Sequence, residues 1–371
     1  MLDLSEILVV SIENAVAAPM CSMRFADAGA RVIKIEPTGG ETARNYDDTV
    51  LGESAYFASL NRGKESVTLN LRNSDDLGLL RRILAKTDVF LRNTAPGSME
   101  RIGLGADSLC REYKRLIVID ILGYGQDTEY RDMKAYDLLV QAESGLCSVT
   151  GTAEEPVKVG VSIADMGTGM NAYSAALEAL IRRISTGQGT AIELAMFDTV
   201  AEWMSVPLLH YEHTGQVTKR YGMAHSSIYP YRPYACKGGT ILIAVQNNEQ
   251  WAIFCNLVLK REDVLVDSRF LENADRVVNR EALDQIISDV FGQTLLSDMS
   301  ARLEQAGIAY GEVRSLADLS QHPALRRQDT IINGNLTETV ASPISGPVKV
   351  KAYIPKLGGQ TLSIRDEFTE T

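Results

Sequence analysis

The alternation of apolar segments with helical segments constrains the fold of this chain most strongly. Strand patterns occur at residues 7–12, 31–36, 66–71, 88–91 and 116–122. Helical patterns lie between them, over residues 19–28 and 75–86. Alternating strands and helices are typical of a parallel sheet with helices on both faces. The sequence therefore predicts an α/β protein with a Rossmann-like, doubly wound parallel sheet.

Ligands of doubly wound sheets bind outside the carboxyl ends of the strands. In this sequence several loops follow or flank the predicted strands, and we expect them to share one crevice. These loops are residues 13–18, 62–72, 93–101, 123–137 and 165–169.

One carboxylate stands near the middle of the chain, between an apolar run and a helical pattern. The run at 157–163 has the pattern of a strand, Asp165 follows it, and the helical pattern extends from about Met170 to Ile184. We therefore expect Asp165 near the positive end of a helix dipole. Gly167 and Gly169 would leave the backbone bare for a ligand. Two interpretations stay open, an N-cap aspartate and a carboxylate nucleophile.

A third interpretation of the same segment is a dinucleotide site. Gly167-x-Gly169-x-x-Ala172 fits the G-x-G-x-x-A fingerprint, and Glu193 would be the acid that binds the ribose. This interpretation would make the protein an NAD-binding oxidoreductase. It is disfavoured because Asp165 would place a negative charge where the pyrophosphate should lie.

The composition argues against several classes of partner. The chain has 371 residues and a formal net charge of −11, so we expect neither nucleic acid nor an anionic membrane as a partner. Five cysteines without a Cys-x-x-Cys pair indicate reduced thiols, as in a cytoplasm. The pair His210 and His213 lacks the further ligands of a metal site. Asp3 and Glu6 replace the basic region of a signal peptide, and no run is long enough to span a membrane. The expectation is a cytoplasmic protein without a metal.

The pattern changes after Phe197, which indicates a second domain. A mainly helical stretch reaches Thr214, and residues 234–245 have the pattern of a hairpin. We expect a large Rossmann-like domain over residues 1–200 and a small α+β domain over residues 225–325. Residues 330–371 would return to the large domain, with 348–354 joining its sheet.

Seven short motifs, in order along the chain, resemble the class III coenzyme A transferases of the CaiB/BaiF type. That family includes formyl-CoA and carnitine CoA-transferases and, as close relatives, the 2-methylacyl-CoA racemases. The motifs are Ala17-Ala18-Pro19, Gly29-Ala30-Arg31-Val32-Ile33-Lys34-Ile35-Glu36, Leu60-Asn61-Arg62-Gly63-Lys64, Asn93-x-x-Pro96-Gly97, Gly123-Tyr124-Gly125-Gln126, Ala135-Tyr136-Asp137 and Asp165-x-Gly167-x-Gly169. The resemblance implies a CoA-binding large domain, a small domain, and a homodimer whose two subunits interlock.

The resemblance also implies roles for individual residues. Asp165 matches the catalytic aspartate, which would carry CoA as an aspartyl-CoA thioester. CoA and acyl-CoA would be substrates, with no permanently bound cofactor. The positions that match the CoA site are Val16, Ala17, Leu69, Arg72, Asn93, Thr94, Ala95, Arg101, Lys134 and Tyr136. Arg62 and Lys64 are further candidates, beside Arg72 and Arg101, to neutralise the CoA phosphates.

Departures from the family pattern bear on the acid substrates. Val16 stands where formyl-CoA transferase has a glutamine, which disfavours oxalate as the acceptor. Residues 41–47 resemble branches that use succinyl-CoA and dicarboxylates. Arg44 or His225 would then hold the distal carboxylate, and the amides around Gly167 would face the oxyanion.

Position 136 separates the transferases from the racemases. The racemases place a histidine base where this chain has Tyr136, with support from a glutamate that Glu249 would supply. A tyrosine with a pKa near 10 is a poor general base at neutral pH, so the transferase is favoured. The alternatives are a racemase, the oxidoreductase described above, and a non-catalytic acyl-CoA-binding protein.

Overall fold

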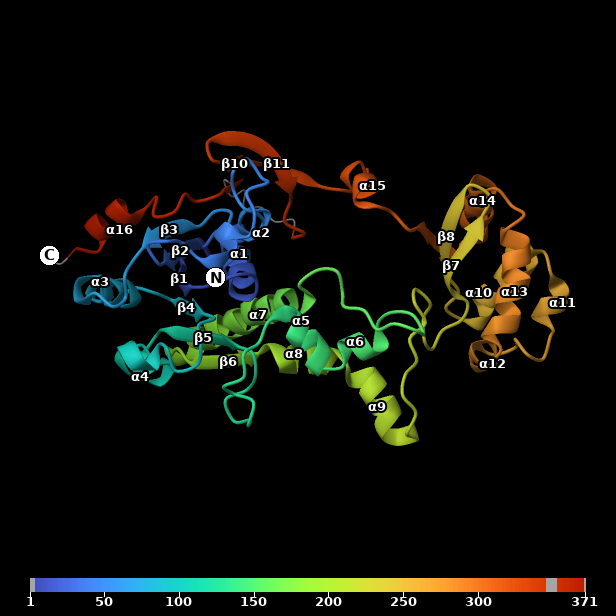
Figure 1. Cartoon of the computed structure of the whole chain (residues 1–371), viewed down its shortest axis with the longest axis horizontal. Coiled ribbons are helices and arrows are strands. Elements are labelled where there is room, and N and C mark those ends of the chain that lie inside the picture. Colours follow the sequence, from blue (N-terminus) through green and yellow to red (C-terminus); the bar gives the residue numbers. More distant parts are fainter. Residues whose placement is uncertain (1–3, 345–351, 370–371) are drawn as a thin grey trace. The chain divides into compact units, whose positions relative to one another are not determined.

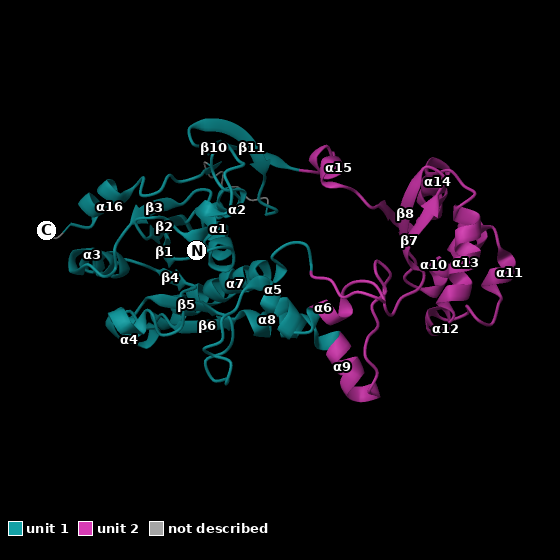
Figure 2. Cartoon of the chain, viewed as in Figure 1, with its two compact units in different colours: residues 1–146, 159–206, 326–371 teal, residues 147–158, 207–325 magenta. Residues whose placement is uncertain are grey.

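The computed structural model describes residues 4–344 and 352–369 and divides the chain into two compact units (Figure 2). Unit 1 contains residues 1–146, 159–206 and 326–371, so both ends of the chain contribute to it. Unit 2 contains residues 147–158 and 207–325.

Unit 1 is built on a six-stranded sheet in the order β3-β2-β1-β4-β5-β6 (Figure 1). All neighbouring strands are parallel, and Val9 of the central β1 lies opposite Val32 of β2 and Val89 of β4. This order and direction confirm the predicted doubly wound fold. The strands are β1 Leu8–Ile12, β2 Arg31–Glu36, β3 Glu65–Thr68, β4 Val89–Arg92, β5 Ile117–Leu122 and β6 Ala191–Ala195.

Helices cover both faces of this sheet, which is why its central strands are apolar on both sides. Val9 faces a core formed with α1 Ala17–Asp27, α7 Ile163–Thr186 and α8 Met196–Trp203. Val10 faces the opposite core, formed with α3 Ser74–Leu84, α4 Ala106–Glu112 and α16 Thr361–Glu367. The shorter elements that begin in this part of the chain are η1 Leu4–Glu6, η2 Thr42–Asn45, α2 Ala55–Leu60, η3 Glu100–Ile102, α5 Asp137–Glu143, α6 Leu146–Val149 and α9 Ser205–Thr214.

The C-terminal segment returns to unit 1 but does not extend the main sheet. β10 Arg327–Ile332 pairs with β11 Asn335–Val340, and β12 Ala352–Tyr353 pairs with β10. The predicted strand at 348–354 therefore joins a separate small sheet through its last residues, and residues 348–351 lie outside the described residues. Gln360 and Thr361 accept hydrogen bonds from the N–H groups of Ser66 and Thr68, which ties α16 to the β3 edge.

Unit 2 has an antiparallel sheet in the order β7-β8-β9, packed against helices. Its core includes Trp251, Phe254 and Phe291. The elements are β7 Tyr231–Cys236, β8 Gly239–Ala244, α10 Asn248–Ile253, the π-helix η4 Phe254–Leu259, α11 Glu262–Leu265, α12 Asn273–Val278, α13 Arg280–Phe291, α14 Leu296–Ala306, β9 Ala309–Glu312 and α15 Leu316–Ser320.

Two further observations concern the whole described chain. In the part of the chain that the structure describes, no helix combines the length and the apolar character needed to cross a membrane. All five cysteines have free thiols.

Candidate active site

The first turn of α7 contains Asp165, and the N-cap interpretation of this residue is wrong. Residues 157–162 form no strand, and the helix starts at Ile163, so Asp165 is its third residue. The capping carboxylate is Asp137, the first residue of α5. Its Oδ1 accepts the N–H of Ala164 at 2.8 Å and that of Asp165 at 3.4 Å. This leaves the Asp165 carboxylate free for another role.

The surroundings of Asp165 disfavour its charge. The side chain is partly exposed, and no described residue forms an ion pair with it. Burial, and then the negative charge of Asp137, raise the pKa of the Asp165 carboxyl to about 7. A carboxyl group with a raised pKa and no ion-pair partner among the described residues is a candidate functional group.

The glycines that follow Asp165 serve helix packing. Gly167 and Gly169 are buried within α7. A Cβ at Gly167 would overlap the Trp203 indole of α8, and one at Gly169 would overlap the Ala17 carbonyl of α1. The expected bare backbone, with amides near Gly167 directed at an oxyanion, is therefore wrong.

The dinucleotide fingerprint also fails, because the glycines are not in a turn. Gly167-x-Gly169-x-x-Ala172 lies wholly inside a helix that begins at Ile163, whereas the fingerprint requires a turn between a strand and a helix. Glu193 accepts a hydrogen bond from the Gln126 N–H at 2.8 Å, a contact within the protein.

The loop after β1 lies against the start of α7. Val16 belongs to a small apolar cluster in which the partly buried Met166 also packs. The Asn93 side chain both donates to the Asn14 carbonyl and accepts from the Asn14 N–H, each at 2.8 Å. The loop after β4 is thereby tied to the loop after β1, as expected where parallel strands end together.

The buried cations beside this loop are structural. Lys64 and Lys34 are completely buried, and their Nζ atoms lie 2.7 and 3.1 Å from Glu13 Oε1. Burial would raise the pKa of Glu13, but Lys34 and Lys64 lower it to about 2. Arg62 pairs with Asp27 at 2.5 Å and is 8% exposed. The prediction that Arg62 and Lys64 bind CoA phosphates is therefore wrong, because both charges are neutralised inside the protein.

Arg44 is also occupied. Its guanidinium donates to both carboxylate oxygens of Glu36, at 2.7 and 2.8 Å, and lies over the Phe57 ring. Oε2 of Glu53 lies 3.5 Å from Nη1 of Arg44. Arg44 is thus placed as a structural cation, and a substrate carboxylate would have to displace these partners.

The other cations of the predicted CoA site face solvent. The side chains of Arg72, Arg101 and Lys134 are exposed, and none has an ion-pair partner among the described residues. Tyr136 is 70% exposed, whereas Leu69 lies in the core beside α3. Exposed, unpaired cations are suited to the phosphate groups of a large anionic ligand.

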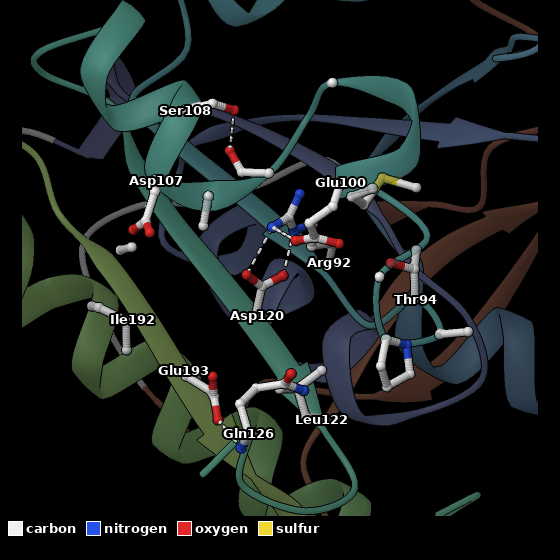
Figure 3. A pocket seen from close by; sticks show the side chains of 18 of the residues that line it. Arg92, Thr94, Glu100, Asp107, Ser108, Asp120, Leu122, Gln126, Ile192 and Glu193 are labelled. Carbon is white, nitrogen blue, oxygen red and sulfur yellow. Dashed lines mark hydrogen bonds and ion pairs between the residues drawn. The ribbon is translucent and has the colours of Figure 1, made fainter. Parts of the chain in front are cut away.

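A cavity of about 710 Å³ lies between α4 and strands β5 and β6 (Figure 3). Thr94 and Ala95 of the predicted CoA turn line it, as does Gln126, but Asp165 does not. Of the five loops expected in one crevice, only 93–101 and 123–137 reach it. Its charged lining has four carboxylates and two guanidinium groups, from Glu100, Asp107, Asp120, Glu193, Arg92 and Arg111. The excess negative charge disfavours phosphate groups here.

His225 lies in unit 2, in the segment before β7. Its Nδ1 accepts the N–H groups of Ser227 and Ile228, both at 3.0 Å, and its ring stacks on Tyr231. A neutral ring that accepts at Nδ1 carries its proton on Nε2. His225 therefore presents a hydrogen-bond donor.

The chain resembles known proteins over nearly its whole length. A model of CoA-transferase family III matches residues 4–365. The succinyl-CoA:glutarate CoA-transferase of Mus musculus is 30% identical over 350 residues, covering 94% of this chain and 80% of that protein. The acetyl-CoA:oxalate CoA-transferase of Acetobacter aceti is 30% identical over 373 residues, covering 98% of this chain and 95% of that protein. Among solved structures, a CaiB/BaiF family protein from Brucella suis matches with a TM-score of 0.84 at 31% identity, over 98% of this chain and 99% of that chain.

Proposed function

Because this chain belongs to CoA-transferase family III, and therefore uses CoA thioesters as substrates, we propose that it moves CoA from succinyl-CoA to a free dicarboxylate. Asp165 is the covalent carrier in this proposal. The observation that carries it is a partly exposed carboxylate with a raised pKa, which caps no helix and forms no ion pair with a described residue.

The chemistry uses Asp165 first as a nucleophile and then as an acyl group. A carboxylate oxygen attacks the thioester carbon of the donor, the carbon–sulfur bond breaks, and CoA leaves as a thiolate. The thiolate attacks the aspartyl carbon of the resulting anhydride, which releases the donor acid and leaves an aspartyl-CoA thioester. The acceptor carboxylate attacks that thioester and expels the thiolate. The thiolate then takes the acceptor acyl group and restores the Asp165 carboxylate.

For binding of CoA, we assign the phosphates to the exposed cations. Arg72, Arg101 and Lys134 follow or flank strands β3, β4 and β5. In a parallel sheet the carboxyl ends of these strands lie along one edge. Val16, Ala17 and the 93–95 turn belong to the same edge, so we place the pantetheine and thioester beside them.

For the acceptor, the dicarboxylate assignment rests on residues 41–47 and on the names of the relatives. Glutarate and oxalate, which occur in those names, are both dicarboxylic acids. Of the two residues that the resemblance suggests for the distal carboxylate, Arg44 is occupied by Glu36 and Glu53, so His225 is the one we propose.

We also propose a homodimer. Several apolar side chains on two helices of this chain are more than half exposed, and we propose that they contribute to the interface. They are Met170, Ile181 and Ile184 of α7 and Val206, Leu209 and Tyr211 of α9.

A panel assay tests the substrate assignment. Succinyl-CoA is incubated with the enzyme and one free acid at a time, and the new CoA thioester is separated by chromatography. The expected acceptors are dicarboxylates, with His225→Leu raising the KM of the dicarboxylate at least about tenfold relative to a monocarboxylate. A panel in which monocarboxylates are the better acceptors would refute the dicarboxylate assignment.

A further inference from the structure

We propose that Asp137, held by Gln141, is a positioning residue for Asp165 that also favours its uncharged, acylated states. This inference rests on the nucleophilic role proposed above for Asp165. The geometry points to it because one turn of α5 contacts both ends of the segment that leads into the nucleophile.

The hydrogen bonds form a clamp. Asp137 Oδ1 accepts from Ala164 N at 2.8 Å, which fixes the first turn of α7. Asp137 Oδ2 accepts from Gln141 Nε2 at 2.6 Å, and Gln141 Oε1 accepts from Val159 N at 2.9 Å. Gln141 is completely buried. A buried amide that bridges a carboxylate and a backbone N–H leaves its partners little freedom.

The clamp also places a negative charge beside Asp165. Burial and the Asp137 charge together raise the pKa of the Asp165 carboxyl to about 7. The other charged side chains on the elements packed against α7, or on the segment before it, are Arg24, Asp27, Asp120, Glu143, Lys158, Glu193, Asp198 and Glu202. The charge that acts on Asp165 is that of Asp137.

This arrangement affects the covalent intermediates. When Asp165 forms an anhydride or a thioester, its negative charge passes to the departing thiolate or acid. The repulsion between Asp165 and Asp137 then disappears. The free carboxylate is therefore disfavoured relative to both acylated forms, and the covalent enzyme accumulates more than it would beside a neutral residue.

Three variants separate charge from position. Asp137→Asn removes the charge but keeps a carbonyl oxygen for Ala164 N. Gln141→Met breaks the clamp and keeps the charge. Glu143→Gln removes an exposed carboxylate of the same helix and serves as the control. Each folded protein is incubated with succinyl-CoA alone, and the CoA adduct is measured by intact mass spectrometry against pH.

We expect Asp137→Asn to move the midpoint of adduct formation to lower pH by about half a unit or more, and to lower the adduct fraction at pH 8. Gln141→Met should leave the midpoint in place and slow adduct formation. Glu143→Gln should match the wild type in both. If the folded Asp137→Asn variant forms the adduct with the same pH midpoint as the wild type, the inference is overturned.

A second measurement separates this inference from the proposed function. The Asp165 carboxyl carbon is titrated by NMR in the wild type and in Asp137→Asn, without any substrate. If the wild type forms no adduct, the proposed function fails. The titration still decides whether Asp137 acts on Asp165. Identical titration curves would overturn the inference, and an acid shift in the variant would support it.

Discussion

At the scale of single residues, the proposed mechanism depends on the charge state of Asp165. The carboxylate is the nucleophile in that proposal, and burial together with the charge of Asp137 disfavours the ionised form. A nucleophile with a pKa of about 7 combines substantial ionisation at neutral pH with higher basicity than an ordinary aspartate.

The first prediction concerns the pH dependence of acylation. The rate of adduct formation from succinyl-CoA should rise with pH and level off above about 7, because Asp165 must lose its proton to attack. Single-turnover measurements between pH 5 and 9 check this. A rate that is already at its plateau at pH 5 would indicate a nucleophile with an ordinary carboxyl pKa.

A second prediction concerns stability. The pKa of Asp165 is raised in the folded state. The contribution of Asp165 to the free energy of unfolding is therefore fully present below its pKa in the unfolded chain, about 4, and is lost as the pH rises through about 7. Asp165→Asn, which keeps the shape without the charge, should raise the free energy of unfolding by about 1 to 2 kcal/mol at pH 8. The gain should vanish toward pH 4. Thermal unfolding at both pH values measures it, and an equal effect at both would contradict the charge argument.

At the scale of secondary-structure elements, α7 holds the site together. It packs on α1 through Gly169 and on α8 through Gly167, and its first turn carries Asp165. Both glycines are required because neighbouring groups occupy the space of a Cβ.

The third prediction follows from this packing. Gly167→Ala should destabilise the protein by about 1 to 3 kcal/mol, because the Trp203 indole must move. Gly160→Ala is the matched control, since among the described residues no heavy atom beyond its two chain neighbours lies within 4 Å of the added Cβ. It should change stability by no more than about 0.5 kcal/mol. Equal unfolding free energies for the two variants would show that the contact with α8 is unimportant.

The sequence predicts the elements of the main sheet well and the start of α7 poorly. The strand predicted at residues 31–36 has the same bounds as β2, in which every residue after Arg31 is buried. In the 157–163 run the β-branched residues are typical of a strand, yet packing against α1 and α8 extends the helix back to Ile163.

The same limit applies to the site. The resemblance predicts a catalytic role for Asp165, but hydrogen-bond partners distant in sequence decide the roles of its neighbours. Asp137 caps a helix that begins 26 residues later, and nothing in the local pattern indicates this. The sequence suggests that Arg62 and Lys64 are free cations, because their partners, Asp27 and Glu13, are far away in sequence.

At the scale of the whole molecule, exposed apolar side chains on α7 and α9 motivate the proposed homodimer. Ile184 is 66% exposed and Val206 63% exposed. The proposed homodimer would have the large, apolar interface of an obligate dimer, so we expect no dissociation on dilution.

The fourth prediction is therefore a stable dimer. Light scattering coupled to gel filtration should give twice the chain mass of 40.6 kDa, unchanged over a hundredfold dilution. Leu209→Glu together with Tyr211→Glu should shift the protein toward monomers or aggregates. A monomer at every concentration would refute the proposed assembly.

The central claim is a covalent enzyme, and intact-mass analysis after incubation with succinyl-CoA alone tests it most directly. The wild type should gain the mass of CoA less one water, and hydroxylamine or a competent acceptor acid should remove it. Asp165→Ala should lose the adduct and the turnover together, because it lacks the carboxylate that acts as acyl carrier. An Asp165→Ala variant that retains full turnover, or still carries CoA, would contradict the account.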